Sequence, residues 1–263
     1  MGQQLSPQAL RGLAVEVAEK AISFLSKMWC SELTEVVEGD TIRADLAADK
    51  MILDAIREKL DRFMVVSEES GVTGNDGYVL VVDPLDGSLN YEHCIRWSSV
   101  SVAVAPPGST SLNEVVAGAI APLWGEILSF AKGEGCFEGN RRVTPRTGES
   151  RILYTYVESL DEAARIASIF SAMPKVKVRS LGSAALEIAM VGLRRGTAYV
   201  DLRGKLRNVD AAAAVGFARE CGARAVDETG DDINVTITEV KPLGSIIVAH
   251  DELPLILEAI RAS

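Results

Sequence analysis

An apolar run from Tyr78 to Val82 ends abruptly in two acids three positions apart, Asp83 and Asp86. The run is typical of a buried strand, and a turn with a glycine and a serine follows the acids. A strand that stops in paired carboxylates and a tight glycine turn suits a hard cation and a phosphate group. What the chain can do therefore depends on which other residues converge on this strand end.

The chain is acidic, with a formal net charge of −10 over 263 residues. This charge argues against general binding to nucleic acid or to an acidic membrane, because a phosphate backbone needs a basic protein surface. It is compatible with a small phosphate ester held by metal ions. Hydrophobic residues make up 48% and charged residues 24%, which predicts a globular protein with a substantial core.

The four cysteines, Cys30, Cys94, Cys136 and Cys221, are far apart in the sequence and form no CxxC motif. We expect reduced and mostly buried thiols in a cytosolic protein. The N-terminus is polar and shows no apolar signal region, and no apolar run reaches the roughly 18 residues of a membrane helix. These features predict a soluble cytoplasmic protein.

Apolar periodicity and turn residues predict an α/β chain with one compact catalytic unit. We expect an N-terminal α+β subdomain over 1–150 with most of the metal ligands, and a C-terminal α/β subdomain over 151–263. Residues 31–42 are predicted to form an acidic surface loop, and residues 133–140 a turn-rich segment. The predicted helices are at about 7–28, 44–60, 161–170, 182–193, 210–221 and 253–260. The predicted strands are at 63–66, 78–82, 98–105, 114–121, 125–131, 151–157, 176–179, 197–200, 223–226 and 245–249.

A second acidic pair, Glu68 and Glu69, follows the strand predicted at 63–66. An exposed acidic turn would look the same, so the pattern is weak in isolation. It lies one short strand before Asp83, however. Neighbouring strands would place both acidic ends at one edge of a sheet.

Four carboxylates, those of Glu68, Asp83, Asp86 and Asp210, could together hold two Mg²⁺ ions. Mg²⁺ prefers oxygen ligands and is commonly held by one or two carboxylates plus phosphate oxygens. Two ions roughly 4 Å apart need three or four carboxylates, at least one of them bridging, and Asp83 could bridge. Leu85 could add its carbonyl oxygen, or its side chain could serve only as core packing.

Gly87 and Ser88 open a turn or short helix whose backbone N–H groups could bind phosphate. Glycine at position 87 lets the backbone approach the anion closely. The Ser88 hydroxyl could bond a metal-bound water, with Asp45 holding that hydroxyl in place. The alternative for Asp45 is structural, because an acid in the first turn of a helix complements the helix dipole.

An aspartyl-phosphate mechanism is the competing chemistry. A DxDG motif after a strand would make its first aspartate the nucleophile. In this chain two residues, Pro84 and Leu85, separate the acids, and the proline stiffens the turn. Metal-activated water is therefore the favoured mechanism.

Three segments resemble the signatures of the inositol monophosphatase family: SEES at 67–70, DPLDGSLNY at 83–91 and VDAAAA at 209–214. Residues 118–140 and 180–187 also resemble the family's central hairpin and its substrate-contacting loop and helix. The family belongs to the lithium-sensitive, Mg²⁺-dependent phosphatases, which include fructose-1,6-bisphosphatases. The resemblance implies a layered αβαβα sandwich, usually a homodimer, that hydrolyses inositol 1-phosphate, fructose 1,6-bisphosphate or both.

The same resemblance implies the metal ligands. Glu68, Asp83 and the Leu85 carbonyl would hold the first ion, and Asp83, Asp86 and Asp210 the second. Glu68 and water would take a weaker third ion. Two to three Mg²⁺ ions per site are thus expected.

The resemblance also implies catalytic and substrate-binding roles. Ser88, with Asp45 and Glu68, would orient a water that attacks phosphorus in line, and a second metal-bound water would protonate the leaving alkoxide. Substrate contacts are implied for Asp86, Gly87, Ser88, Gly182, Ser183 and Ala184.

Arg203 is the most informative departure from the animal members of the family, which carry a glutamate at that place for the inositol hydroxyls. Arg203, Lys205 and Arg179 could bind a distal phosphate, and this segment looks like archaeal enzymes that act on both substrates. The alternative is that these cations are solvated surface charges. We interpret Arg207 as a surface or structural residue.

Two other functions stay open. A 3′-phosphoadenosine 5′-phosphate phosphatase would need aromatic residues to stack on adenine, and aromatic residues make up only 5% of this chain. A metal-binding scaffold without catalysis would have lost the water-orienting residues, whereas Glu68, Ser88 and Asp45 are all present.

Overall fold

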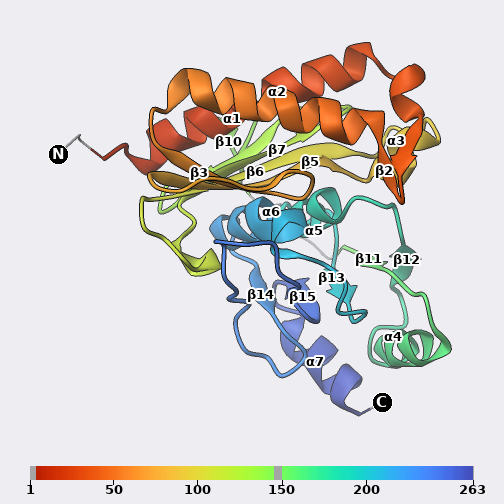
Figure 1. The fold of residues 1–263 in the computed structure, drawn as a ribbon. Helices are drawn as coiled ribbons and strands as arrows, with labels where there is room; N and C mark the ends of the chain where they lie inside the picture. The colour runs from red at the N-terminus through yellow and green to blue at the C-terminus, as the bar shows by residue number, and fades with distance from the viewer. Residues whose placement is uncertain (1–3, 145–149, 263) are drawn as a thin grey trace.

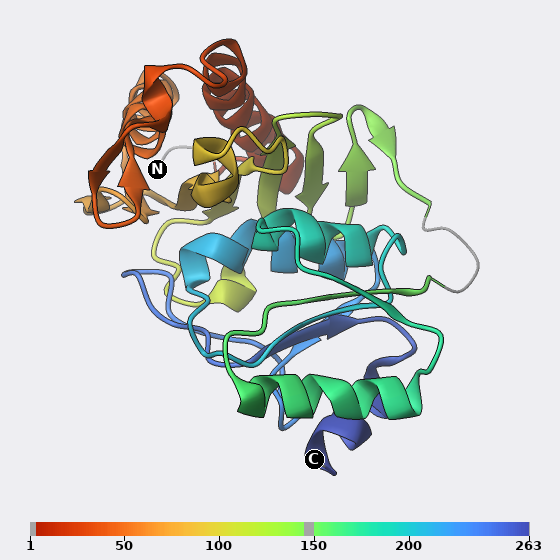
Figure 2. The ribbon, with the colours of Figure 1, turned by 90° about the vertical axis from the view of Figure 1, so that its right-hand side faces the viewer.

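The computed structural model describes residues 4–144 and 150–262. The helices are α1 (Pro7–Lys27), α2 (Arg43–Lys59), α3 (Ser88–Glu92), α4 (Leu160–Ala172), α5 (Ala184–Gly192), α6 (Asn208–Glu220) and α7 (Leu253–Arg261). Figures 1 and 2 show that helices and sheets stack in alternating layers. α1 and α2 cover one face of an eight-stranded sheet, α5 and α6 lie between this sheet and a five-stranded sheet, and α4 and α7 cover the far face. The predicted αβαβα sandwich is confirmed.

The larger sheet contains β3 (Phe63–Ser67), β4 (Gly71–Gly74), β5 (Tyr78–Asp86), β6 (Ser99–Ala105), β7 (Ala117–Pro122), β8 (Leu128–Ala131), β9 (Gly135–Glu138) and β10 (Arg141–Arg142). Their order across the sheet is β10-β9-β8-β7-β6-β5-β3-β4. β3 and β5 are parallel neighbours, with Ser67 opposite Val82. The acids that follow these strands therefore lie at one edge of the sheet, as the sequence predicted.

The smaller sheet contains β11 (Ile152–Thr155), β12 (Lys177–Arg179), β13 (Ala198–Asp201), β14 (Arg224–Val226) and β15 (Ile246–Ala249). Their order is β12-β11-β13-β15-β14. β11 is parallel to β12 and β13, and β15 is antiparallel to both of its neighbours. The larger sheet uses residues up to 142 and the smaller one residues from 152 onward. The division into subdomains over 1–150 and 151–263 stays a proposal.

The central helices α5 and α6 are packed from both sides, which accounts for their small residues. Alanines 211–214 of α6 are all buried. A Cβ atom on Gly216 would lie 2.2 Å from Cζ of Phe130 on β8, and one on Gly192 of α5 would lie 3.0 Å from Cα of Ala218. Larger side chains would force the layers apart. This packing fixes the N-terminal turn of α6, which carries Asp210.

The segment predicted as a surface loop, residues 31–42, contains regular structure. It forms a 3₁₀ turn, η1 (Glu32–Thr34), and an antiparallel pair, β1 (Val36–Glu38) and β2 (Thr41–Ile42). β1 is exposed along its whole length, so it shows no burial periodicity from which a strand could be predicted. A second 3₁₀ turn, η2 (Leu112–Glu114), precedes β7.

The prediction of four reduced thiols is wrong, because the cysteines form two disulfides, Cys30–Cys94 and Cys136–Cys221. The first pair is exposed and joins the segment after α1 to the segment after α3, whereas the second pair is buried. The partners are 64 and 85 residues apart in sequence. Only the tertiary fold brings them together, so no local cysteine motif announces them.

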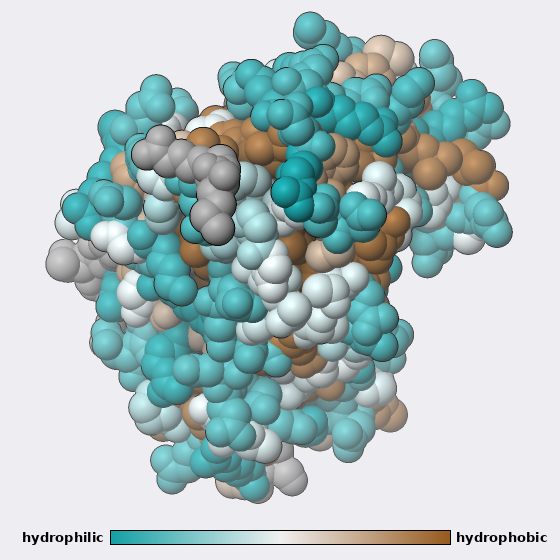
Figure 3. Space-filling model, turned by 60° about the vertical axis from the view of Figure 1, so that its left-hand side comes forward, coloured by the Kyte–Doolittle hydropathy of each residue, from teal (hydrophilic) through white to brown (hydrophobic). Residues whose placement is uncertain are grey.

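Within residues 4–144 and 150–262, no helix has the length and hydrophobicity to cross a membrane. The face in Figure 3 is mostly hydrophilic, with hydrophobic residues more frequent in its upper half. Trp124 is 71% exposed and therefore is not part of the core.

Candidate active site

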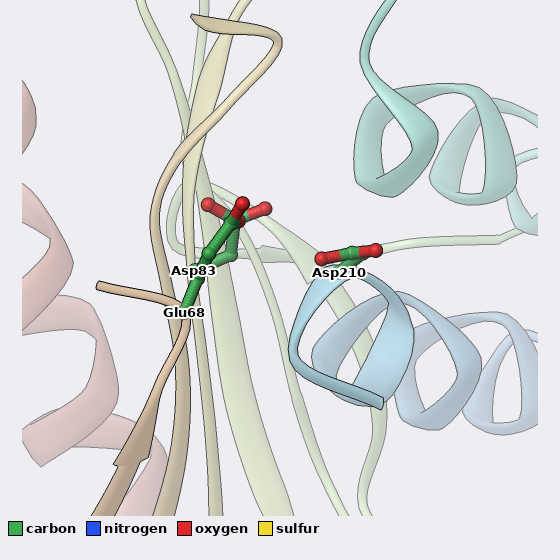
Figure 4. A group of neighbouring side chains, drawn as sticks. All are labelled: Glu68, Asp83 and Asp210. Atoms are coloured by element: carbon green, nitrogen blue, oxygen red, sulfur yellow. The ribbon is translucent and has the colours of Figure 1, made fainter. Parts of the chain in front are cut away.

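Three carboxylates from separate elements converge at the edge of the larger sheet. Glu68 follows β3, Asp83 lies near the end of β5, and Asp210 is in the first turn of α6. Each offers a carboxylate oxygen, and these oxygens all lie within 4.8 Å of one another. Figure 4 shows Glu68 and Asp83 side by side, with Asp210 facing them from the helix. The cluster can thus be shared by one cation or by two neighbouring cations.

Backbone structure positions each member of this cluster, which we call the acidic cluster. The Glu68 N–H donates to the Val82 carbonyl at 3.3 Å and continues the β3–β5 pairing by one residue. Asp83 Oδ1 accepts from the Leu85 N–H at 3.0 Å. Asp210 Oδ2 accepts from the Arg207 N–H at 2.8 Å, so Asp210 caps its own helix. The backbone of Glu68 and the side chains of Asp83 and Asp210 are therefore held in place before any ligand arrives.

The electrostatics of the acidic cluster favour a bound cation. Burial, together with the neighbouring charges of Glu68, Asp86 and Asp210, raises the pKa of Asp83 well above its usual range. Burial also raises the pKa of Asp210 to about 6, although the Arg207 charge acts in the opposite direction. Buried carboxylates that repel one another are stabilised by a nearby positive charge. Their oxygens are the ligands that Mg²⁺ and similar hard cations prefer, so these residues fit a metal site.

Asp86 lies in the same region but is bound to the start of α5. Its oxygens accept hydrogen bonds from the Ser183 hydroxyl and from the N–H groups of Ala184 and Ala185, at 3.0 and 2.9 Å. Burial raises its pKa to about 7. Ser183 and Ala184, which the sequence assigned to substrate, therefore contact Asp86 in this structure and join the two halves of the molecule at the site.

The turn after β5 is held by backbone contacts. Gly87 has a φ of 86°, which favours glycine, and it caps the short helix α3. A Cβ atom at this position would lie 2.7 Å from the Gly182 carbonyl oxygen. The Ser98 hydroxyl donates to the Gly87 carbonyl at 2.8 Å, and Asn90 Nδ2 donates to the Leu181 carbonyl at 2.6 Å. Gly87, Ser88 and Gly182 thus sit in a rigid junction beside the acidic cluster.

Asp45 makes a structural contact here. Its Oδ2 accepts from the Ile42 N–H at 2.7 Å, and burial raises its pKa to about 7. Among the described residues, no hydrogen bond joins Asp45 to Ser88. The neighbouring Asp49 of α2 accepts from the hydroxyls of Ser67 and Ser70, at 2.5 and 3.2 Å, and so fixes the turn that carries Glu68. Sequence reasoning missed Asp49, although it lies one helical turn after Asp45.

Arg203 is held by acids and is not a solvated surface charge. Its side chain is only 13% exposed. Its Nη2 donates to Asp201 at 2.6 Å and its Nη1 donates to Glu158 at 2.5 Å. Its guanidinium carbon also lies over the Tyr156 ring, 4.4 Å from the ring centroid. Lys205, in contrast, is 65% exposed and pairs with the same Glu158.

From the sequence, Arg179 was expected to bind a distal phosphate and Arg207 to be a surface or structural residue, whereas Glu187 was given no role. Arg179 is exposed, and its Nη1 donates to the Val178 carbonyl at 2.7 Å. Glu187 of α5 is fully buried, accepts from the Leu181 N–H at 2.6 Å, and has its pKa raised by burial to about 8. Arg207 pairs with both Glu68 and Asp210. Its spacing of three from Asp210 could have indicated one of these pairs, but nothing in the sequence indicates the other.

Comparison with known proteins identifies the family. The profile of the inositol monophosphatase family matches residues 6–263. An inositol-1-monophosphatase of Aeropyrum pernix is 40% identical over 260 residues, covering 94% of this chain and 95% of that protein. A fructose-1,6-bisphosphatase/inositol-1-monophosphatase of Methanothermobacter thermautotrophicus is 30% identical over 273 residues, covering 95% of this chain and 97% of that protein.

The fold agrees with a solved structure from Pyrococcus horikoshii, a protein described as similar to inositol-1 monophosphatase. The TM-score is 0.81 at 28% identity, and the match covers 98% of this chain and 99% of that one. The names of the relatives confirm the predicted enzyme class, a phosphoric monoester hydrolase. With a family match along nearly its whole length, this chain belongs to the inositol monophosphatase family.

Proposed function

We propose that this protein is a Mg²⁺-dependent phosphomonoesterase that hydrolyses inositol 1-phosphate, fructose 1,6-bisphosphate or both. The observation that carries the proposal is the convergence of Glu68, Asp83 and Asp210, whose carboxylate oxygens lie within 4.8 Å of one another beside a glycine turn. Family membership supports metal dependence and a small phosphate ester as the substrate. The homodimer and the cytoplasmic location stay predictions.

The metal ligands that we propose are Glu68, Asp83 and the Leu85 carbonyl for one ion, and Asp83, Asp86 and Asp210 for a second. Glu68 would share a weaker third ion. Bound Mg²⁺ would supply positive charge for the phosphoryl oxygens and lower the pKa of a bound water. Because Asp86 accepts hydrogen bonds from α5, its free lone pairs are the ones available for a metal.

The protein's own groups would bind and orient the phosphate. The N–H groups of Gly87 and Ser88 begin α3 and are proposed to bind phosphate oxygens. The Ser88 hydroxyl, with Glu68 and Asp45, is proposed to orient the attacking water. For Asp45 this requires a change of partner, because its carboxylate now caps Ile42. Gly182, Ser183 and Ala184 would line the substrate from the other half of the molecule.

Attack by Asp83 itself is disfavoured. Its carboxylate is buried among other acids and accepts from the Leu85 N–H at 3.0 Å. Burial and the neighbouring acids raise the pKa of Asp83, which lowers the share of ionised carboxylate that could attack phosphorus. These features support a bridging ligand rather than a phosphoaspartate.

Substrate choice is proposed to depend on Arg203, together with the exposed cations Lys205 and Arg179. A distal phosphate near Arg203 would compete with Glu158, which already pairs with both Arg203 and Lys205. Exchange of a carboxylate for a dianionic phosphate is favourable for an arginine fork. The variant Glu158→Gln should therefore lower the KM for fructose 1,6-bisphosphate more than that for inositol 1-phosphate.

A direct assay tests the proposal. Phosphate release is measured from inositol 1-phosphate and fructose 1,6-bisphosphate, with Mg²⁺ and with EDTA. We expect turnover of at least one substrate with Mg²⁺ and its loss with EDTA. Full activity in EDTA, or no hydrolysis of either ester with Mg²⁺, would refute the proposed function.

A further inference from the structure

The guanidinium of Arg207 places a positive charge within the acidic cluster. The Nη2 group of Arg207 donates to Glu68 Oε1 and also, at 3.2 Å, to Asp210 Oδ1. The Arg207 backbone N–H donates to the other oxygen of Asp210 at 2.8 Å. One guanidinium therefore joins the end of β3 to the start of α6, across 139 residues of sequence.

This ion pair differs from the surface pairs of the same protein. The Arg207, Glu68 and Asp210 side chains are 36%, 27% and 11% exposed, whereas Arg224 and Asp232 in a typical surface pair are 60% and 67% exposed. Half-buried charges are less screened by water, so the guanidinium acts strongly on both carboxylates. It offsets part of the repulsion among Glu68, Asp83 and Asp210.

We propose that Arg207 is an internal cation that holds Glu68 and Asp210 together in the metal-free protein and releases them when Mg²⁺ binds. The inference rests on the proposed metal site. Mg²⁺ needs carboxylate oxygens at about 2.1 Å, and the guanidinium now contacts one oxygen of Glu68 and both oxygens of Asp210. Two cations on the same ligands repel each other, so metal binding requires the side chain to turn away.

The position of Arg207 permits this movement. Its backbone stays anchored by the N–H bond to Asp210, while more than a third of its side chain is exposed. The guanidinium can therefore leave the cluster without unfolding the start of α6. The role is one of positioning and competition, and it sets how tightly the site holds its metal.

Two effects of opposite sign follow for Arg207→Gln. Without the guanidinium, the carboxylates repel one another, so the metal-free protein loses thermal stability. The metal meets no competitor, so the Kd for Mg²⁺ falls, by up to about fivefold if the ion pair contributes what pairs near the surface usually contribute. A merely structural arginine would lower stability without tightening the binding of Mg²⁺.

The test is titration of chelator-treated protein with MgCl₂ in a calorimeter, together with thermal unfolding in EDTA. The wild type is compared with Arg207→Gln, with Arg207→Lys, which keeps a positive charge, and with the control Arg224→Gln. We expect tighter Mg²⁺ binding and a lower Tm in EDTA for Arg207→Gln, smaller changes for Arg207→Lys, and none for the control.

Unchanged or weaker Mg²⁺ binding by folded Arg207→Gln would overturn the inference and leave the proposed metal site intact. If Arg207→Gln does not fold, Arg207→Lys decides. Tighter Mg²⁺ binding with a lower Tm in EDTA supports the inference, and unchanged or weaker Mg²⁺ binding contradicts it. Failure of the wild type to bind Mg²⁺ at all would overturn both the inference and the metal site.

Discussion

Substitution of Gly87 by alanine should damage the junction beside the acidic cluster. The new Cβ atom would lie 2.7 Å from the Gly182 carbonyl oxygen and 3.0 Å from that of Trp97. Both are backbone atoms and cannot simply rotate away. The left-handed backbone of residue 87 costs alanine about 1–2 kcal/mol, and overpacking adds about 1–3 kcal/mol. We expect the free energy of unfolding to fall by about 2–5 kcal/mol in total.

The matched control is Gly108→Ala. Gly108 has a φ of 82°, close to the 86° of Gly87, but no atom lies within 4 Å of its Cβ position. It should show only the backbone cost of about 1–2 kcal/mol. Urea unfolding and circular dichroism measure both variants, and Gly87→Ala should lower Tm by roughly 5–15 °C. If Gly87→Ala lowers the free energy of unfolding no more than Gly108→Ala does, the close contacts around Gly87 do not require glycine at that position.

Three further predictions concern charge and cross-links. The pKa of Asp86 is raised to about 7 and that of Asp210 to about 6, so the folded metal-free protein binds more protons than the unfolded chain does. The Tm in EDTA should therefore fall from pH 5 to pH 8, and a rise would contradict this. Arg203→Ala should lower kcat/KM for fructose 1,6-bisphosphate more than for inositol 1-phosphate, and equal losses would remove the distal-phosphate role. Replacement of Cys30 and Cys94 by serine removes a cross-link between residues 64 positions apart and should lower the free energy of unfolding in urea by about 4 kcal/mol. An unchanged urea midpoint would show that this disulfide does not stabilise the fold.

Local pattern was enough to predict where two of the acids meet. Glu68 and Asp83 each follow an apolar run typical of a strand, and the two runs are close in sequence. Pairing of the two strands was therefore the natural prediction, and the structure has this pairing. Asp210 lies on a helix more than a hundred residues later. Its carboxylate made it a candidate ligand, but no local pattern placed it beside the other two, and the resemblance to a family supplied that link. The layer order followed from the same resemblance, together with the strand and helix alternation of the second half.

Contacts between distant segments were beyond the sequence. The pairing of Arg207 with Glu68 and the two disulfides depend on how the layers stack, which no local periodicity encodes. The contacts of Asp86 with the start of α5 are of the same kind. Asp45 illustrates another limit, because a first-turn acid suits both a helix cap and a catalytic partner, and the structure shows the cap.

The variant Asp83→Asn gives the most direct test of the central claim, that the acidic cluster binds the metal that drives phosphate release. Asparagine keeps the size of the side chain and removes its charge, so the fold should survive and circular dichroism should show it. We predict that Mg²⁺-dependent phosphate release falls by at least about a hundredfold, because charge at the reacting centre is usually the largest contribution to such catalysis. Asp210→Asn should behave in the same way. Undiminished turnover in either folded variant would contradict the account.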